Sequence, residues 1–373
     1  MQSGKDEVGI YKNMLKVIPR ILFNYLSCHF NYISTLPASL TFSVSYKCNF
    51  RCKTCNIWKD CNMENELDLS QIDKIFHSLG KSLYWVTLDG GEPFLRRNLA
   101  EICELIYKNC KPTIINIPSN GSLTEQTISC VERILQLCPD TNLIINLSLD
   151  HIAEKHDAIR GFQGAFNCLL NTYKGLRYIK HPLLRVGINT VVSDYNIKDL
   201  EIIQSFVRDL KPDSHLFEVA QLRDEFRNKD FNNIVPQEQD TLLLLQQLSK
   251  STGIVNNSAI GKCLHIIRRH YYSLIEENFV RKQQNTRCFA GTSSAYILPD
   301  GKVWACCNHD WLMGDLKEYD FNFNAFWNNK TARSIRQYIK ENKCFCMQAN
   351  ANYLNLLHSP KHLAKISCDI LFS

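Results

Sequence analysis

The chain has 373 residues, of which 45% are hydrophobic and 21% charged, and these values are typical of a globular protein with a sizeable core. Its net charge of +6 comes from 43 basic and 37 acidic residues without a long run of Lys or Arg, so the composition does not indicate nucleic-acid binding. The 17 cysteines, with no cleavable signal peptide and no apolar run of about 18 residues, favour metal ligation in a reducing cytoplasm over disulfides or a membrane span.

Residues 8–34 combine apolar and aromatic side chains with Lys12, Lys16 and Arg20, and Pro19 interrupts them. We favour a helix packed against the folded domain. The alternative is an interfacial helix on an anionic membrane, or a lid over an apolar substrate, which would make the protein peripheral to the membrane.

The first predicted strand runs from Ser39 to Tyr46, where apolar and polar residues alternate. Cys48, Cys52 and Cys55 follow it at a C-x3-C-x2-C spacing. Three thiolates in one loop can hold three irons of a [4Fe–4S] cube and leave the fourth iron without a protein ligand. A zinc knuckle is the alternative, since C-x2-C is also a zinc spacing.

Further strands and helices then alternate along the chain. Ser70 is the expected N-cap of the first helix. Six strands separated by helices predict a parallel sheet with right-handed crossovers. The expected strands are 39–46, 83–88, 113–117, 142–149, 184–192 and 215–222, and the expected helices are 69–79, 98–110, 124–138, 165–179 and 197–210.

From Pro236 the pattern changes to two helices, 239–248 and 259–283, which we interpret as a bridge to the last part of the chain. A hairpin follows, with strands 293–298 and 302–306 around a Pro-Asp-Gly turn. After a helix-like stretch, 324–341, comes the pair Cys344 and Cys346.

Four cysteines surround this hairpin in a two-plus-two arrangement and could complete a second [4Fe–4S] cluster. They are Cys288, Cys306, Cys344 and Cys346. A four-cysteine zinc site and unligated thiols are the alternatives.

The cysteine loop, together with Gly90-Gly91-Glu92-Pro93 further along the chain, resembles the radical S-adenosylmethionine (radical SAM) superfamily. This resemblance implies an α/β fold with a partial (β/α)6 barrel over residues 39–235. It also implies that the open iron chelates SAM, and that one-electron reduction releases a 5′-deoxyadenosyl radical.

The pattern Cys288-x12-Gly301-x4-Cys306 is similar to the opening of the SPASM and twitch extensions, which hold auxiliary iron–sulfur clusters. The similarity implies a small hairpin-plus-helix cluster domain at 287–373, following an N-terminal segment at 1–38 and the bridge at 236–286. Only Cys368 follows Cys346, which favours a single auxiliary cluster, and the Gly-x4-Cys register favours Cys306 over its neighbour Cys307.

The resemblance also implies roles for residues at the strand ends, each of which could instead be an ordinary turn or cap residue. Contacts to SAM are expected from the methionine-binding Gly90, Gly91 and Glu92, from Ser119 and Asn120, from the ribose-binding Ser148 and Asp150, from Asn189, and from the backbone near Ile57.

Three further features concern the loops around this site. Thr54 departs from the aromatic residue that many family members carry there. The stretch His156 to Gly161 is expected to fix a loop through ion pairs, with substrate contact as the alternative. Glu218 and Arg223, near the end of the sixth strand, are the candidate catalytic residues that would contact substrate.

The predicted activity is hydrogen abstraction from an unactivated carbon, with the auxiliary cluster binding substrate or accepting an electron and a flavodoxin or ferredoxin supplying one. The 1–38 segment is too short for a peptide-recognition domain, so a small molecule, glycan or lipid is favoured as substrate. A ribosomal-peptide maturase of the SPASM type is the second hypothesis. A non-catalytic iron–sulfur or zinc protein for electron transfer or assembly is the third.

Overall fold

The computed structural model describes residues 35–60, 65–250, 259–341 and 344–371. The predictions for residues 8–34, including membrane contact, lie outside the described residues. Within those residues, no helix is both long and apolar enough to cross a membrane.

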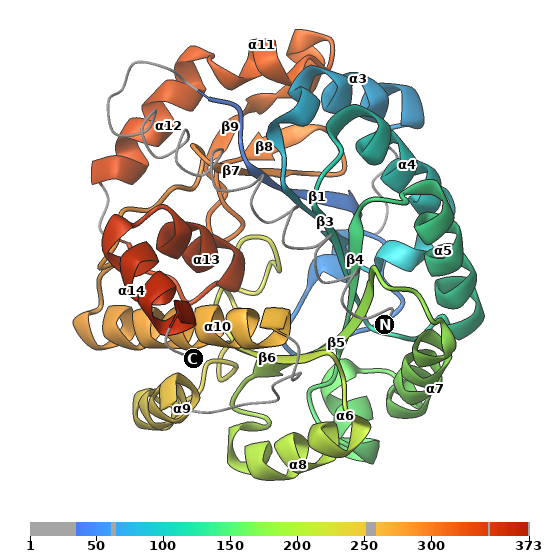
Figure 1. Cartoon of the computed structure of the whole chain (residues 1–373), viewed down its shortest axis with the longest axis vertical. Helices are drawn as coiled ribbons and strands as arrows, with labels where there is room; N and C mark the ends of the chain where they lie inside the picture. Colours follow the sequence, from blue (N-terminus) through green and yellow to red (C-terminus); the bar gives the residue numbers. More distant parts are fainter. Residues whose placement is uncertain (1–34, 61–64, 251–258, 342–343, 372–373) are drawn as a thin grey trace.

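The centre of the molecule is a nine-stranded sheet in the order β6-β5-β4-β3-β2-β1-β7-β8-β9 (Figure 1). Strands β1 to β6 are all parallel, as the alternation of strands and helices predicts. Their bounds are β1 Ser39–Ser45, β2 Trp85–Gly90, β3 Ile114–Ser119, β4 Asn142–Ser148, β5 Leu184–Val192 and β6 Ser214–Val219.

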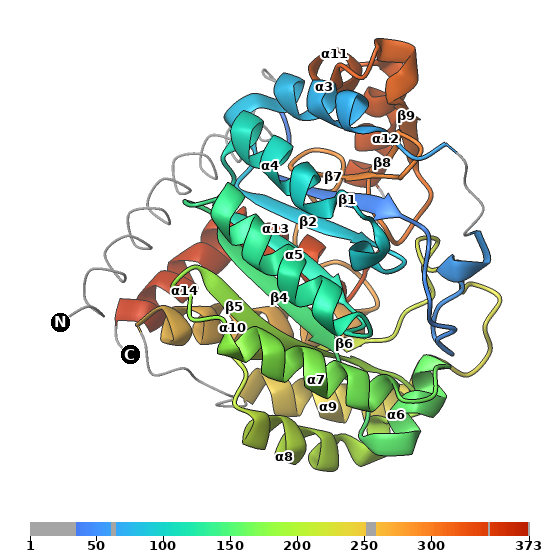
Figure 2. The same cartoon turned by 90° about the vertical axis from the view of Figure 1, so that its right-hand side faces the viewer.

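Helices between the strands cover the outer face of this sheet, and Figure 2 shows α4, α5 and α7 lying side by side over the strands. Their bounds are α3 Leu69–Leu79, α4 Leu99–Cys110, α5 Thr124–Leu137, α6 Ala153–Arg160, α7 Ala165–Tyr178 and α8 Leu200–Leu210. Helix α6 was not predicted, because the stretch around His156 was interpreted as a loop.

The pleat of β1 separates the core from the interior of the barrel. Leu40, Phe42 and Val44 are buried, and Phe42 packs on Phe76 of α3 with ring centroids 6.0 Å apart. The alternate residues Ser39 and Thr41 line a cavity on the inner face.

The predicted hairpin is part of the same sheet. Strand β7, Ser294–Ile297, pairs in parallel with β1, and the register sets Ser39 opposite Ser294. Strands β8, Lys302–Trp304, and β9, Leu312–Asp315, then add antiparallel edges. The cysteine-rich hairpin therefore extends the barrel sheet beyond β1, while the proposed domain boundaries stay predictions.

Among the described residues, six α-helices follow β6 or accompany the hairpin. Helices α10, α13 and α14 gather beside β6 at the open side of the sheet, and α9 packs on α10 (Figure 1). Their bounds are α9 Glu238–Lys250, α10 Ala259–Arg281, α11 Phe323–Trp327, α12 Lys330–Glu341, α13 Ala349–Leu357 and α14 Pro360–Leu371.

Helix α3 spans Leu69–Leu79 as predicted, but its N-cap lies two residues before the expected Ser70. Asp68 is its N-cap: the carboxylate accepts from Gln71 N at 2.8 Å, and Gln71 Oε1 accepts from Asp68 N at 3.1 Å. This reciprocal capping box satisfies two backbone donors. The prediction of Ser70 as N-cap was wrong because a carboxylate two residues earlier completes the box.

Candidate functional site

The loop after β1 carries three half-buried cysteines, Cys48, Cys52 and Cys55. The C-terminal end of α6 holds this loop in place, because Arg51 N donates to Arg160 O at 3.2 Å and Lys53 N donates to Ile159 O at 2.8 Å. Hydrogen bonds to α6 therefore fix the loop backbone independently of the cysteine side chains.

Each sulfur in this loop accepts a hydrogen bond. Phe50 N donates to Cys48 Sγ and Ile57 N to Cys55 Sγ, both at 3.5 Å, while Arg160 Nη1 lies 3.8 Å from Cys52 Sγ. Burial raises the pKa of Cys48 to about 11 and raises the pKa of Cys52 and Cys55 as well. Such thiols shed their protons when metal binds, and the three donors then stabilise the thiolates.

Gly90 and Gly91 bring the end of β2 against the end of β1. A Cβ atom on Gly90, whose φ is +136°, would lie 2.1 Å from Ser45 O, and one on Gly91 would lie 2.3 Å from Lys47 O. Both glycines also line the cavity. The glycines are therefore required by backbone packing beside the cysteine loop.

Glu92 is only 1% exposed, and its carboxylate is occupied by protein donors. It accepts from Ser119 Oγ at 2.9 Å, Asn120 N at 2.7 Å and Phe94 N at 3.1 Å. Burial raises the pKa of Glu92 to about 7, although these donors lower it. The carboxylate ties the loop after β2 to the end of β3 and does not line the cavity.

Asp150 has a similar position after β4. Its Oδ2 forms an ion pair with Arg160 Nε at 2.9 Å, and its Oδ1 accepts from Val191 N at 2.9 Å. Asp157 accepts from Gly164 N at 2.6 Å, so this stretch fixes the loop as expected. Arg160 also lines the cavity, and its Nη2 has no hydrogen-bond partner among the described residues.

A cavity of about 910 Å³ occupies the inner face of the sheet. It brings together most of the residues that the sequence singled out. The predicted residues that line it are Cys48, Cys52, Cys55, Ile57, Gly90, Gly91, Ser119, Asn120, Ser148, Asn189, Glu218 and Arg223. Glu92 and Asp150 lie behind this lining and position it.

Glu218 and Arg223 reach the cavity from β6 and the loop after it. Glu218 accepts from Asn189 Nδ2 at 3.2 Å and from Ala349 N at 3.4 Å, so it joins β5 to α13. Arg223 is 7% exposed, and its guanidinium lies over the Phe226 ring at 4.9 Å. Their contact with substrate stays a prediction.

Asp89 and Glu225 also line the cavity, and the sequence analysis assigned neither a role. Their carboxyl groups are hydrogen-bonded to each other, and burial together with this proximity raises the pKa of Asp89 well above its usual range. The position of Asp89 directly before Gly90 at a strand end was an available signal. Glu225 offered no such sequence signal, because it lies in an irregular loop.

The second cysteine group lies beside the hairpin. Cys288, Cys306, Cys344 and Cys346 are close enough that their charges raise one another's pKa, and burial raises the pKa of Cys306 to about 12. Backbone N–H groups donate to three of the sulfurs: Ala290 to Cys288, His309 to Cys306 and Gln348 to Cys346. The arrangement repeats the donor pattern of the barrel loop.

Both cysteine groups have the chemistry of iron–sulfur ligand sets. A cubic cluster binds each thiolate to a different iron, and each group supplies several cysteine thiols on one side of the sheet. The residues present therefore fit [4Fe–4S] clusters.

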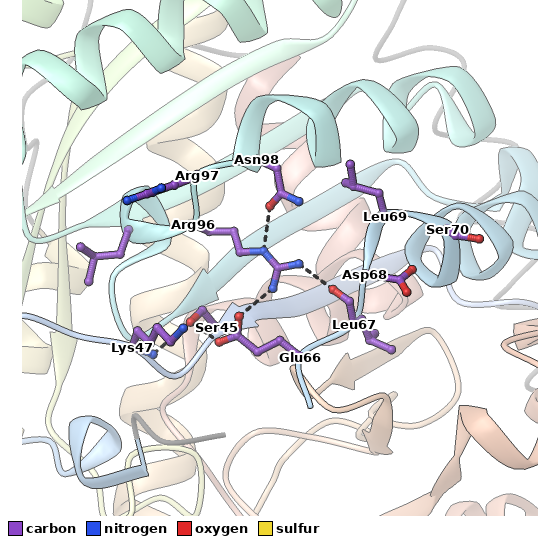
Figure 3. A pocket seen from close by; sticks show the side chains of 11 residues that line it. Ser45, Lys47, Glu66, Leu67, Asp68, Leu69, Ser70, Arg96, Arg97 and Asn98 are labelled. Carbon is purple, nitrogen blue, oxygen red and sulfur yellow. Dashed lines mark hydrogen bonds and ion pairs between the residues drawn. The ribbon is translucent and has the colours of Figure 1, made fainter. Parts of the chain in front are cut away.

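Arg96 fixes the opposite side of the β1 end, as Figure 3 shows. Its guanidinium donates to Val44 O at 3.0 Å, Leu67 O at 2.6 Å and Asn98 Oδ1 at 2.8 Å, and it pairs with Glu66 at 2.9 Å. All these partners belong to the protein, so we interpret the contacts of Arg96 as structural: they hold the end of β1 from which the cysteine loop begins.

Comparisons with known proteins agree with these two groups. A family model described as the radical SAM superfamily matches residues 42–207, and one described as an iron-sulfur cluster-binding domain, SPASM, matches residues 288–348. These ranges contain the first and second cysteine groups respectively.

Relatives and solved structures extend the comparison. A probable GTP 3′,8-cyclase of Methanocaldococcus jannaschii is 29% identical over 276 residues, which cover 73% of this chain and 85% of that protein. The Fe-coproporphyrin III synthase of Methanosarcina barkeri is 27% identical over 174 residues, which cover 46% of this chain but only 41% of that protein. The structure of native anSMEcpe with bound AdoMet and Cp18Cys peptide matches with a TM-score of 0.56 at 15% identity, covering 86% of this chain and 88% of that chain.

Proposed function

Because the chain belongs to the radical SAM superfamily and carries a C-terminal SPASM domain, we propose that its cavity converts a small-molecule, glycan or lipid-type substrate by radical chemistry. The radical SAM domain implies SAM and a [4Fe–4S] cluster, and the SPASM domain implies an auxiliary iron–sulfur cluster. Bound at Cys48, Cys52 and Cys55, the first cluster supplies reductive cleavage of SAM to a 5′-deoxyadenosyl radical.

The single observation that carries this proposal is the shared cavity. The three loop cysteines line it, and so do Cys307 and Gln348 next to the second cysteine group. A substrate held there lies between the two groups, where it can lose a hydrogen atom on one side and exchange an electron on the other.

The residues of the chain have separate tasks in this proposal. The cavity-lining residues from Ser119 to Asn189 and the backbone at Ile57 hold SAM. Glu92 and Asp150 do not line the cavity; their hydrogen bonds hold neighbouring strand ends together. The free Nη2 of Arg160 suits a carboxylate of the bound cofactor, and Glu218 and Arg223 contact substrate.

Two observations favour a small molecule with an apolar part. Ile267 of α10, Leu357 of α13 and Ile366 of α14 line the far side of the cavity, which suits an apolar portion of the substrate. One relative described above is named an Fe-coproporphyrin III synthase and another a probable GTP 3′,8-cyclase, and both names refer to small molecules. A flavodoxin or ferredoxin is proposed as electron donor, and a cytoplasmic location remains a prediction.

Peptide maturation is the competing reading, since the solved relative described above binds a peptide. At 15% identity that likeness concerns the fold, so it does not transfer the substrate. A pulldown with peptides encoded nearby would distinguish the two: specific capture and modification of one peptide would contradict the small-molecule proposal.

The test is anaerobic reconstitution, iron and sulfide counting, and assay of 5′-deoxyadenosine after reduction with SAM. We expect ~8 irons per chain for two cubane clusters. Changing Cys48, Cys52 and Cys55 to Ala should leave ~4 irons and abolish 5′-deoxyadenosine. Bound zinc, or no 5′-deoxyadenosine from a protein with both clusters reduced, would contradict the proposal in favour of a non-catalytic role.

A further inference from the structure

Cys307 is a cysteine of the SPASM region that faces the cavity. It is 6% exposed and lines the cavity, whereas none of Cys288, Cys306, Cys344 and Cys346 does. Glu225, Arg223 and Cys306 are charged or ionisable neighbours of Cys307. Adjacent residues in the chain thus have different surroundings: Cys306 joins the cysteine group, and Cys307 points to the substrate space.

Polar groups surround the Cys307 thiol. The side-chain amide of Gln348 donates to Cys307 Sγ, and the carboxyl groups of Glu225 and Asp89 lie beside the thiol. Glu225 N also donates to Cys307 O at 3.2 Å. All four side chains line the cavity, so the thiol is fixed there with a carboxyl pair beside it.

Unused polar atoms around the thiol point independently to a bound molecule. Arg223 is only 7% exposed, yet its Nε has no hydrogen-bond partner among the described residues. The same holds for Glu225 Oε2, which lies 3.8 Å from Arg223 Nη1, beyond hydrogen-bond distance. Buried polar atoms of this kind are costly unless a ligand satisfies them.

We propose that Cys307 is a catalytic residue whose thiol donates a hydrogen atom to the carbon radical formed in this cavity. The proposal rests on the proposed radical chemistry. An S–H bond is weaker than most C–H bonds, so transfer from sulfur to carbon is downhill.

The substrate carbon gives one hydrogen atom to the 5′-deoxyadenosyl radical and receives one from Cys307, whose S–H bond breaks and leaves a thiyl radical. The thiyl regains the thiol by taking one electron from the external one-electron donor and one proton through Glu225. The substrate is neither oxidised nor reduced, and when the two hydrogens use opposite faces its carbon is inverted.

The experiment needs SAM alone as probe, because without substrate the 5′-deoxyadenosyl radical is itself the carbon radical in the cavity. Reconstituted full-length protein is exchanged into thiol-free D2O buffer and reduced with titanium(III) citrate, and the 5′-deoxyadenosine is analysed by mass spectrometry. We expect one solvent deuterium in the product from the wild type. In Cys307→Ser, whose O–H bond is too strong to donate, the deuterium falls to natural abundance, while Cys368→Ser on α14 retains it.

Iron content provides a second readout. Cys307→Ser should keep ~8 irons per chain, whereas Cys306→Ser should keep ~4. Loss of iron from Cys307→Ser would make Cys307 a ligand and overturn the proposal. Unlabelled 5′-deoxyadenosine from the wild type, or equal labelling in Cys307→Ser, would also overturn it. No 5′-deoxyadenosine at all would instead contradict the proposed function.

Discussion

At the scale of single residues, Glu92 shows how a buried group can organise the site without touching the cavity. Its carboxylate accepts from Phe94, Ser119 and Asn120 while being 1% exposed. Burial disfavours the charged form more than the three donors favour it, so the pKa rises to about 7 from 4.5.

This shift predicts that Glu92 makes the protein less stable as the pH rises. Between the two pKa values the folded state binds more protons than the unfolded state, so its contribution is full below 4.5 and is lost as the pH rises through 7. We expect the free energy of unfolding to be about 1.4 kcal/mol larger near pH ~6 than near pH ~8 from this group.

Urea denaturation at both pH values measures the difference. Glu92→Gln should abolish this component, whereas Glu154→Gln, an exposed change on α6, should keep it. A pH dependence in Glu92→Gln equal to that of the wild type would show that another group is responsible.

The sequence alone identified most of the residues at the site but could not show how they are arranged. The spacing of Cys48, Cys52 and Cys55 and the Gly-Gly-Glu stretch predicted which residues gather at the strand ends. The sequence could not show that Glu92 and Asp150 do not line the cavity, because that depends on which donors the neighbouring strand presents. Nor could it show that Cys307 and Glu225 meet, since a loop and a hairpin far apart in the chain bring them together.

At the scale of elements, the start of α3 rests on a capping box that the sequence analysis missed. Asp68→Ala removes the acceptor for Gln71 N and should lower the free energy of unfolding by about 1 kcal/mol. Ser70→Ala, at the originally predicted cap, should change it by about 0.5 kcal/mol or less. Chemical denaturation of both variants decides the matter, and a larger loss in Ser70→Ala would contradict the observed cap.

Arg96 connects three segments at the base of the cysteine loop, where Figure 3 shows its guanidinium between Glu66, Leu67 and Asn98. Arg96→Ala should cost about 3 kcal/mol, because Val44 O, Leu67 O and the Glu66 carboxylate lose their partner. Arg97→Ala is the matched control, with an expected cost of about 0.5 kcal/mol or less. Thermal unfolding of the apoproteins measures both, and equal costs would show that the clamp contributes little.

Elements with a clear period were predicted well, and those set by tertiary contacts were not. The six parallel strands and the helices between them follow from alternation and amphipathic spacing. Helix α6 was missed because its polar sequence, Ala-Glu-Lys-His-Asp-Ala-Ile-Arg, carries little hydrophobic signal. Strand β9 was missed because Leu312–Asp315 has only four residues and acquires its structure by pairing with β8.

At the scale of the whole molecule, the pairing of β7 with β1 makes the two cysteine groups parts of one structure. Parallel pairing of strands more than 200 residues apart leaves no local signature, so the sequence could not show that the hairpin joins the barrel sheet. Because β1 leads into the cysteine loop and β7 follows Cys288, the pairing fixes the spacing of the two groups. The shared cavity is a consequence of this sheet rather than of a flexible interface.

The two proposed ligand sets also differ in how much chain they would connect, which predicts unequal contributions to stability. The first closes only the loop from Cys48 to Cys55, while the second joins Cys288 to Cys346 across the hairpin and α12. By loop-closure entropy the two cross-links are worth about 2.5 and about 4 kcal/mol. Loss of the second set should therefore lower the Tm of the reconstituted protein more than loss of the first.

Thermal unfolding under anaerobic conditions compares Cys288→Ala/Cys306→Ala with the triple Ala variant of Cys48, Cys52 and Cys55. Both variants should converge on the wild type when iron is removed by a chelator, which controls for packing effects of the substitutions. A larger drop in Tm for the triple variant would mean that the barrel cluster, rather than the auxiliary one, ties the molecule together. It would also weaken the assignment of Cys344 and Cys346 to the same cluster as Cys288.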